Sequence, residues 1–137
     1  MKTTIQKGEI AELRFQLRAI EKGMTVSRPT TSCPYDFVLD DGDSLRRVQI
    51  KYADGRSSHS DGSVLVRLSS PSVGRRSGRA CYRDGEVDLV VVYLPSVGGL
   101  VALEPNVFDG RSTVTIRISR PKNNQSKGVL LASDVEW

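Results

Sequence analysis

The chain has 137 residues, of which 38% are hydrophobic and 26% are charged, and its formal net charge is +4. This length suits a single domain over residues 1–137, and the modest basic charge permits nucleic acid binding without requiring it. No apolar run approaches the roughly 20 residues of a membrane span and the N-terminus has no signal-peptide pattern, so we expect a cytoplasmic protein without membrane contact.

The first predicted element is a helix from about Ile5 to Lys22, with Thr3 or Thr4 as its N-cap and Gly23 as its C-terminal stop. It has two apolar faces. One stripe comprises Ile10, Leu13, Leu17 and Ile20, and a second face comprises Gly8, Ala11, Phe15 and Ala19. The small residues of the second face favour close packing against a sheet.

Glu12 projects from the face that carries the small residues. A carboxylate among apolar neighbours needs a partner, which could be Arg14 or Arg18 at the helix surface, or an ion held by a second acid. We favour the ion. Glu9, on the flank of the other stripe, is the competing ligand candidate, although solvation explains it more simply.

Two strands over residues 35–40 and 45–52, joined by a four-residue loop, are predicted to form a β-hairpin. The expected register pairs Asp40 with Leu45, Val38 with Arg47 and Asp36 with Gln49. Since side chains alternate along a strand, Asp36, Gln49 and Lys51 share one face. The opposite face carries Phe37, Leu39, Val48 and Ile50. Such polar groups inside an apolar run indicate a functional site, because an unpaired buried charge is costly.

A loop over 53–62 is followed by a predicted strand from Ser63 to Leu68 and by a segment, 69–84, rich in glycine and arginine. Its arginines are Arg75, Arg76, Arg79 and Arg83. One guanidinium group can bind two phosphate oxygens, so we favour these residues as DNA contacts. The alternative is a solvated surface loop. The same loops hold His59, the single histidine, to which we assign no role.

The run from Val87 to Leu94 is almost wholly apolar and predicts a central strand covered on both faces. Asp88 is therefore unusual in it. We favour a structural role, as a partner of Lys51 or Tyr82, over a further acid near a metal ion.

Short strands are predicted at Leu100–Leu103, ended by Glu104 and Pro105, and at Thr113–Ser119, while Ser133 could cap a last helical turn. The intervening loop, 120–127, carries side chains able to contact phosphates and base edges. They are Lys122, Asn123, Asn124 and Gln125. A plain polar turn is the alternative. Cys33 and Cys81 lie far apart without metal-ligand spacing, so we expect reduced, passive thiols.

The order Asp36, hairpin, Gln49-x-Lys51 resembles the core of the PD-(D/E)-x-K nuclease superfamily. It is similar to the variant of small group I intron-encoded endonucleases, in which Gln replaces the second acid. Further similar segments occur in the same order: Lys7–Glu12, Tyr35-Asp36, Val48–Lys51, Gly85–Leu89 and Pro121–Gln125. Nearly the whole chain is thus covered. It departs from the pattern at Pro34, which is not adjacent to Asp36, and at Tyr52 after the lysine.

The element order itself predicts an α/β or α+β sheet with the first helix against it. The resemblance implies a restriction-endonuclease-like core, a mixed sheet of four or five strands flanked by helices. It also implies a Mg²⁺ site, with Mn²⁺ as the alternative ion. Its ligands would be Asp36, Glu12, the Gln49 side-chain oxygen and the Ile50 carbonyl, which are hard oxygen donors. Lys51 would orient the attacking water or offset transition-state charge.

These features favour a metal-dependent endonuclease that cuts double-stranded DNA at specific sites, of the homing type. Cutting both strands with so small a chain implies a homodimer or homotetramer. The alternatives are a junction-resolving or repair nuclease with the same core, and a DNA-binding module of this fold that no longer cleaves.

Overall fold

The computed structural model describes residues 1–55, 62–68, 82, 85–119 and 129–137. Its elements are α1 (Thr4–Glu21), β1 (Thr25–Ser27), β2 (Phe37–Asp40), β3 (Leu45–Tyr52), β4 (Ser63–Arg67), β5 (Leu89–Leu94), β6 (Gly99–Leu103), α2 (Pro105–Phe108), β7 (Thr113–Arg117) and a 3-10 turn (Ala132–Asp134). The predicted first helix and the predicted strands are present, with bounds within two residues of expectation. Ser133 does not cap the last turn, because it lies inside the 3-10 turn, whose N-cap is Leu131. The edge strand β1 and the short helix α2 are elements that the sequence pattern did not indicate.

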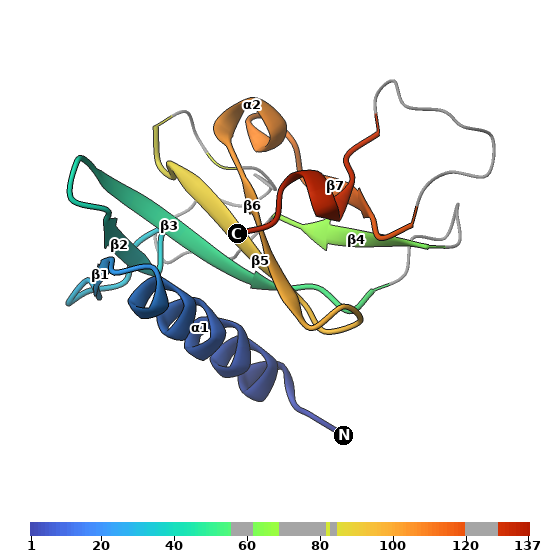
Figure 1. Cartoon of the computed structure of the whole chain (residues 1–137), viewed down its shortest axis with the longest axis horizontal. Helices are drawn as coiled ribbons and strands as arrows, with labels where there is room; N and C mark the ends of the chain where they lie inside the picture. The colour runs from blue at the N-terminus through green and yellow to red at the C-terminus, as the bar shows by residue number, and fades with distance from the viewer. Residues whose placement is uncertain (56–61, 69–81, 83–84, 120–128) are drawn as a thin grey trace.

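Five strands form a mixed sheet in the order β1-β2-β3-β5-β6, as expected from the resemblance (Figure 1). β3 and β5 run parallel, whereas the other neighbours are antiparallel. The predicted hairpin register is confirmed where β2 and β3 pair, since Asp40 lies opposite Leu45 and Val38 opposite Arg47. All six residues of β5 are buried, because this strand lies between two others and is covered on both faces.

Helix α1 packs on one face of this sheet. Thr3 caps it, accepting a hydrogen bond from the Gln6 N–H. Ala11, Phe15 and Ala19 are buried, and Phe15 stacks between the rings of Phe37 and Trp137, with centroid distances of 5.5 and 4.9 Å. The small-residue face therefore meets the sheet as expected. Gly8 is the exception, because a Cβ added there would have nothing within 4 Å.

The second apolar stripe of α1 faces outward. Leu13, Leu17 and Ile20 are 61%, 57% and 69% exposed. Only Ile10 at its margin packs against the core. Within the described residues, no helix is both long enough and apolar enough to cross a membrane.

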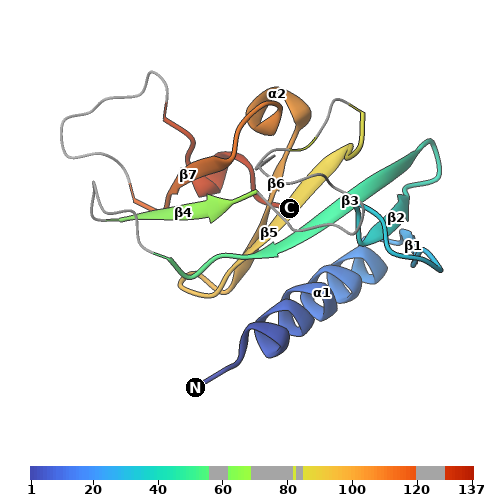
Figure 2. The same cartoon turned by 180° about the vertical axis from the view of Figure 1, so that it is seen from behind.

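The other face of the sheet is covered mainly by a second, two-stranded sheet, β4–β7, and not by a long helix (Figure 2). Alternation along these strands turns Val64 and Val66 of β4, and Val114 and Ile116 of β7, into the core. Phe108 of α2 joins the same cluster and meets Tyr82 edge-on at 6.0 Å. The helices that flank the sheet are thus α1 and the single turn of α2.

Candidate active site

The two faces of β3 carry different chemistry. Val48 and Ile50 belong to the core cluster beneath α1, together with Phe37 of β2. By alternation, Gln49 and Lys51 lie on the opposite face, toward the cluster that includes Tyr82. The apolar and polar faces of the hairpin are therefore separated as the sequence predicted.

Asp36 lies immediately before β2, where it is held by the backbone of β3. Its own N–H donates to the Val48 carbonyl at 2.9 Å, and its carboxylate accepts the Ile50 N–H at 2.8 Å. Burial raises the pKa of Asp36, while the Ile50 N–H, Lys51 and Arg28 act to lower it. A half-buried acid is thus fixed beside the strand that carries Gln49 and Lys51.

The Ile50 carbonyl lies along the same edge of β3 as Asp36. The N–H and C=O of one strand residue point to the same edge, and β2 begins to pair with β3 only at Phe37. Beyond that point, the Ile50 carbonyl accepts a long 3.4 Å contact from the Gln49 amide nitrogen. A backbone oxygen therefore lies beside the Asp36 carboxylate.

Glu12 of α1 approaches the same place from the helix side. Its pKa is raised by burial and then by the charge of Asp36, and is lowered by Arg28. Arg28 donates to a Glu12 carboxylate oxygen at 3.3 Å. The arginine that pairs with Glu12 is therefore Arg28, and not the Arg14 or Arg18 considered from the sequence. Glu9 is exposed, as solvation predicted.

Gln49 and Lys51 are the remaining polar side chains of the candidate site. Gln49 is only 8% exposed. The Lys51 ammonium lies 6.0 Å from the centroid of the Tyr82 ring, and its charge lowers the pKa of Asp36. The site thus combines two acids, one amide and one ammonium group, drawn from α1, β3 and the residue before β2.

These residues fit a small divalent cation. Glu12 and Asp36 are two partly buried carboxylates, and the charge of Asp36 makes Glu12 harder to ionise, a cost that a cation would relieve. No group of three or more Asp, Glu, His or Cys able to hold a metal ion occurs in the described part of the chain. Two carboxylates supplemented by amide and backbone oxygens suit Mg²⁺, which retains several waters.

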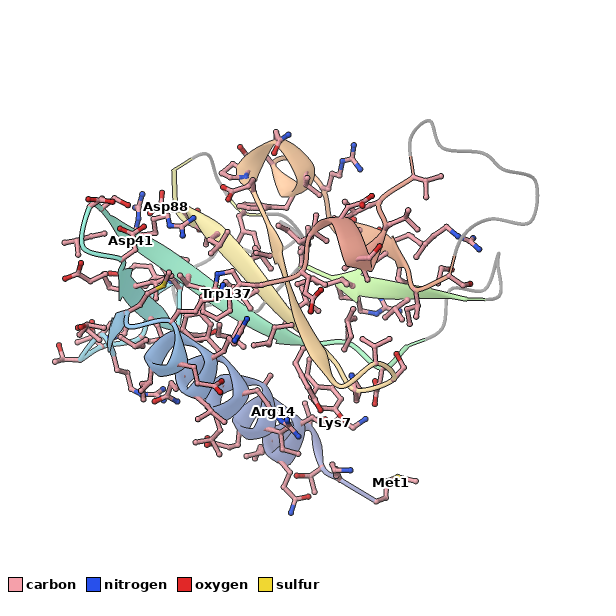
Figure 3. All side chains as sticks on the ribbon, viewed as in Figure 1. Met1, Lys7, Arg14, Asp41, Asp88 and Trp137 are labelled. Atoms are coloured by element: carbon pink, nitrogen blue, oxygen red, sulfur yellow. The ribbon has the colours of Figure 1, made fainter. Side chains whose placement is uncertain are left out.

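Asp88 has a structural position, as expected, but its ion-pair partner is Arg47. Its carboxylate accepts from the Arg47 backbone N–H at 2.8 Å and from the guanidinium at 3.0 and 3.1 Å. These contacts lower the pKa of Asp88. Figure 3 shows Asp88 at the end of the sheet near the β2–β3 turn, marked by Asp41. Asp88 therefore joins β5 to β3 at the start of their parallel pairing.

The eight candidate DNA-contacting residues lie outside the described residues, as do His59 and Cys81. They are Arg75, Arg76, Arg79, Arg83, Lys122, Asn123, Asn124 and Gln125. Cys33 is a free thiol.

Sequence reasoning missed Arg28. This residue follows β1, a strand of three residues that is too short for its alternation to be recognised. Its guanidinium also lies over the Phe37 ring, 4.6 Å from the centroid. The signal that could have found it is Glu12 itself, a partly buried acid in need of a cation.

The family model described as PD-(D/E)XK endonuclease matches residues 2–137. Among solved structures, a bacterial homing endonuclease, I-Ssp6803I, superimposes with a TM-score of 0.71 at 22% identity, covering 99% of this chain and 88% of the other. The Holliday junction resolvase Hjc of the archaeal hyperthermophile Archaeoglobus fulgidus gives 0.50 at 11% identity, covering 81% and 84%. No curated protein matches the chain significantly. At these identities the structural likeness establishes a shared fold.

Proposed function

The chain belongs to the PD-(D/E)XK endonuclease family, and on that premise we propose that it is a Mg²⁺-dependent endonuclease that cuts double-stranded DNA at specific sites. The observation that carries this proposal is the Asp36 carboxylate held by the Ile50 N–H at 2.8 Å, with the charge of Lys51 acting on Asp36 and the charge of Asp36 acting on Glu12. Carboxylates, a backbone carbonyl and an ammonium group at one sheet edge are the groups that phosphodiester hydrolysis needs.

Asp36, Glu12, the Gln49 side-chain oxygen and the Ile50 carbonyl would hold the cation. When bound, Mg²⁺ would polarise the scissile phosphate and make the attacking water more acidic. Mn²⁺, which accepts the same oxygen ligands, is the expected substitute.

Lys51 and Asp36 act directly on the reacting groups in this proposal. The Lys51 ammonium orients the attacking water or offsets the negative charge that grows on the phosphate oxygens. The Ile50 N–H holds the Asp36 carboxylate in one orientation, which limits the reorganisation needed when substrate arrives.

The homing type of activity is supported by the fold shared with the bacterial homing endonuclease over 99% of this chain. A junction-resolving activity is the second candidate, supported by the weaker likeness to the archaeal resolvase. The fold serves both substrates, so only a substrate comparison separates them.

We propose that the enzyme assembles as a homodimer or homotetramer. One active site cuts one strand, so a symmetric pair of sites suits the two strands of a duplex. Sedimentation or light scattering of the purified protein measures the oligomer directly, and a monomer at cleavage-competent concentrations would contradict this part of the proposal.

The arginines of segment 69–84 and the polar residues of loop 120–127 are proposed to contact DNA phosphates and base edges. Replacing one arginine by alanine is expected to lower the slope of log affinity against log salt by about 1. An unchanged slope would assign that arginine to the solvated surface.

Cleavage assays on supercoiled plasmid, linear duplex libraries and four-way junctions, each with Mg²⁺ and with EDTA, test the main proposal. We expect metal-dependent cuts at defined duplex sites and none with EDTA. Preferential cutting of junctions would favour the resolvase. DNA binding without cleavage on all these substrates would mean a non-catalytic module. Asp36→Asn serves as the matched control for contaminating nuclease.

A further inference from the structure

Arg28 is a positively charged residue of the candidate site, and the proposed metal-dependent mechanism gives it no role. Its side chain is 57% exposed and, among the residues that the structure describes, donates one hydrogen bond, at 3.3 Å, to Glu12, which is 19% exposed. It also acts on Asp36, whose pKa its charge lowers. One guanidinium therefore interacts with both acids that are proposed to hold the divalent ion.

The position of Arg28 is set by two elements. The residue directly follows β1, whose last pair with β2 joins Ser27 and Val38, and its guanidinium stacks on Phe37, the first residue of β2. Phe37 is buried and fixed against Phe15 of α1. The ring thus presents the guanidinium to Glu12 while more than half of the side chain stays accessible.

Charge balance changes when a divalent ion enters. Without the ion, the charges that act on Glu12 and Asp36 include Arg28 and Lys51, which are positive, and that of Glu9, which is negative and acts on Glu12. A divalent ion adds two positive charges at the same acids, so Arg28 and the ion repel each other and share one partner. The excess positive charge then favours an anion, and a DNA phosphate is the anion that the proposed substrate provides.

We propose that Arg28 is the counter-ion of Glu12 in the metal-free protein, and that it releases Glu12 to the divalent ion and binds a DNA phosphate next to the cleaved bond. This inference rests on the proposed function. It adds Arg28 to the site as a residue that pairs first with Glu12 and then with a DNA phosphate. The exposed side chain and the long 3.3 Å hydrogen bond to Glu12 favour such an exchange.

The test uses the full chain and two binding measurements that need no cleavage. Mn²⁺ binding without DNA is followed by titration calorimetry, and binding of a short duplex DNA is followed by anisotropy in Ca²⁺. Arg28→Ala is expected to bind Mn²⁺ about fivefold more tightly, because a repelling charge is gone. It is expected to bind DNA about three- to tenfold more weakly, because a phosphate contact is lost.

Opposite changes in the two affinities are the signature of the exchange, since damage to the fold would weaken both. Arg28→Lys keeps the charge, so its Mn²⁺ affinity is expected to remain within about twofold of wild type, whereas its DNA affinity should fall between those of wild type and Arg28→Ala because lysine lacks the planar guanidinium that stacks on Phe37. Arg14→Ala is the matched control. Arg14 also stacks on a ring, that of Tyr93 at 5.3 Å, but the charges that shift the pKa values of Glu12 and Asp36 do not include it.

Unchanged or weaker Mn²⁺ binding by Arg28→Ala, with wild-type binding intact, would overturn the inference and leave the metal site standing. Tighter Mn²⁺ binding with unchanged DNA affinity would overturn the phosphate step. Absence of saturable Mn²⁺ binding by the wild-type protein would instead remove the proposed function, and this inference with it.

Discussion

The backbone N–H of Ile50 donates a 2.8 Å hydrogen bond to the carboxylate of Asp36. The acid is thereby tied to the same strand that carries Gln49 and Lys51. The spacing between Asp36 and these two side chains therefore depends on the pairing of neighbouring segments of one hairpin, which gives it rigid support.

Replacement of Asp36 separates its charge from its hydrogen bond. Asp36→Asn retains an oxygen for the Ile50 N–H but removes the negative charge, so we expect a folded protein whose cleavage rate is lower by at least about 100-fold. Asp36→Ala also leaves the Ile50 N–H without its acceptor and should be less stable than Asp36→Asn by about 1–3 kcal/mol. Plasmid nicking and urea unfolding measure the two effects. Equal cleavage by Asp36→Asn and wild type would exclude a catalytic Asp36.

Lys51 is expected to act through its ammonium group and not through packing. Lys51→Met keeps most of the side-chain length, and we expect a loss of cleavage rate of about 100- to 1,000-fold. Binding of duplex DNA in Ca²⁺ should change by less than about fivefold, because most of the affinity comes from other phosphate contacts. Lys51→Ala serves as a second variant. Cleavage near the wild-type rate in both would remove Lys51 from the mechanism.

Gln49 stands at the position of the second acid in the PD-(D/E)XK pattern, so Gln49→Glu should strengthen cation binding. A third negative charge beside Asp36 is expected to tighten Mn²⁺ binding about tenfold. In EDTA the same variant should unfold at a lower temperature, because the added carboxylate is buried without its cation. Gln49→Met is the neutral control. Unaltered Mn²⁺ affinity in Gln49→Glu would place residue 49 outside the ligand set.

Asp88 is expected to stabilise the fold without taking part in cleavage. Asp88→Asn weakens its charged contacts with Arg47, a pair that is partly exposed, and should lower the free energy of unfolding by about 1–2 kcal/mol. Arg47→Met should have a similar effect, and the double variant should lose less than the two losses combined. The cleavage rate of the folded fraction should stay unchanged. A strong loss of rate at full folding would reassign Asp88 to the chemistry.

Glu12 should make metal-free stability depend on pH. Its pKa is raised in the folded protein by burial and by Asp36, so unfolding lets it ionise more easily. The loss of stability caused by Glu12 is absent at a pH below the ordinary carboxyl pKa. It grows as the pH rises from there to the raised pKa of Glu12 in the folded protein. Glu12→Gln removes this cost. In EDTA its melting temperature should exceed that of wild type at neutral pH and converge with it below about pH 4. A constant difference across this range would contradict the burial effect.

Much of the hairpin could be predicted from sequence. Alternation assigns Phe37 and Val48 to one face and Gln49 and Lys51 to the other, and the four-residue loop fixes the register, as the pairing of Asp40 with Leu45 confirms. The partner of Glu12 could not be predicted, because Arg28 is separated from it by a turn and an edge strand. Likewise, the choice of Arg47 for Asp88 depends on the parallel pairing of β3 with β5.

The sequence by itself determined the helix, the strands and the face of the sheet on which each polar residue lies, because these follow from local periodicity and turn geometry. Only the tertiary structure decided which helical acid reaches Asp36, which arginine neutralises it, and that a two-stranded sheet covers the second face. Those outcomes depend on contacts between segments far apart in the chain, and such contacts are selected by the joint burial of surfaces that no single segment specifies.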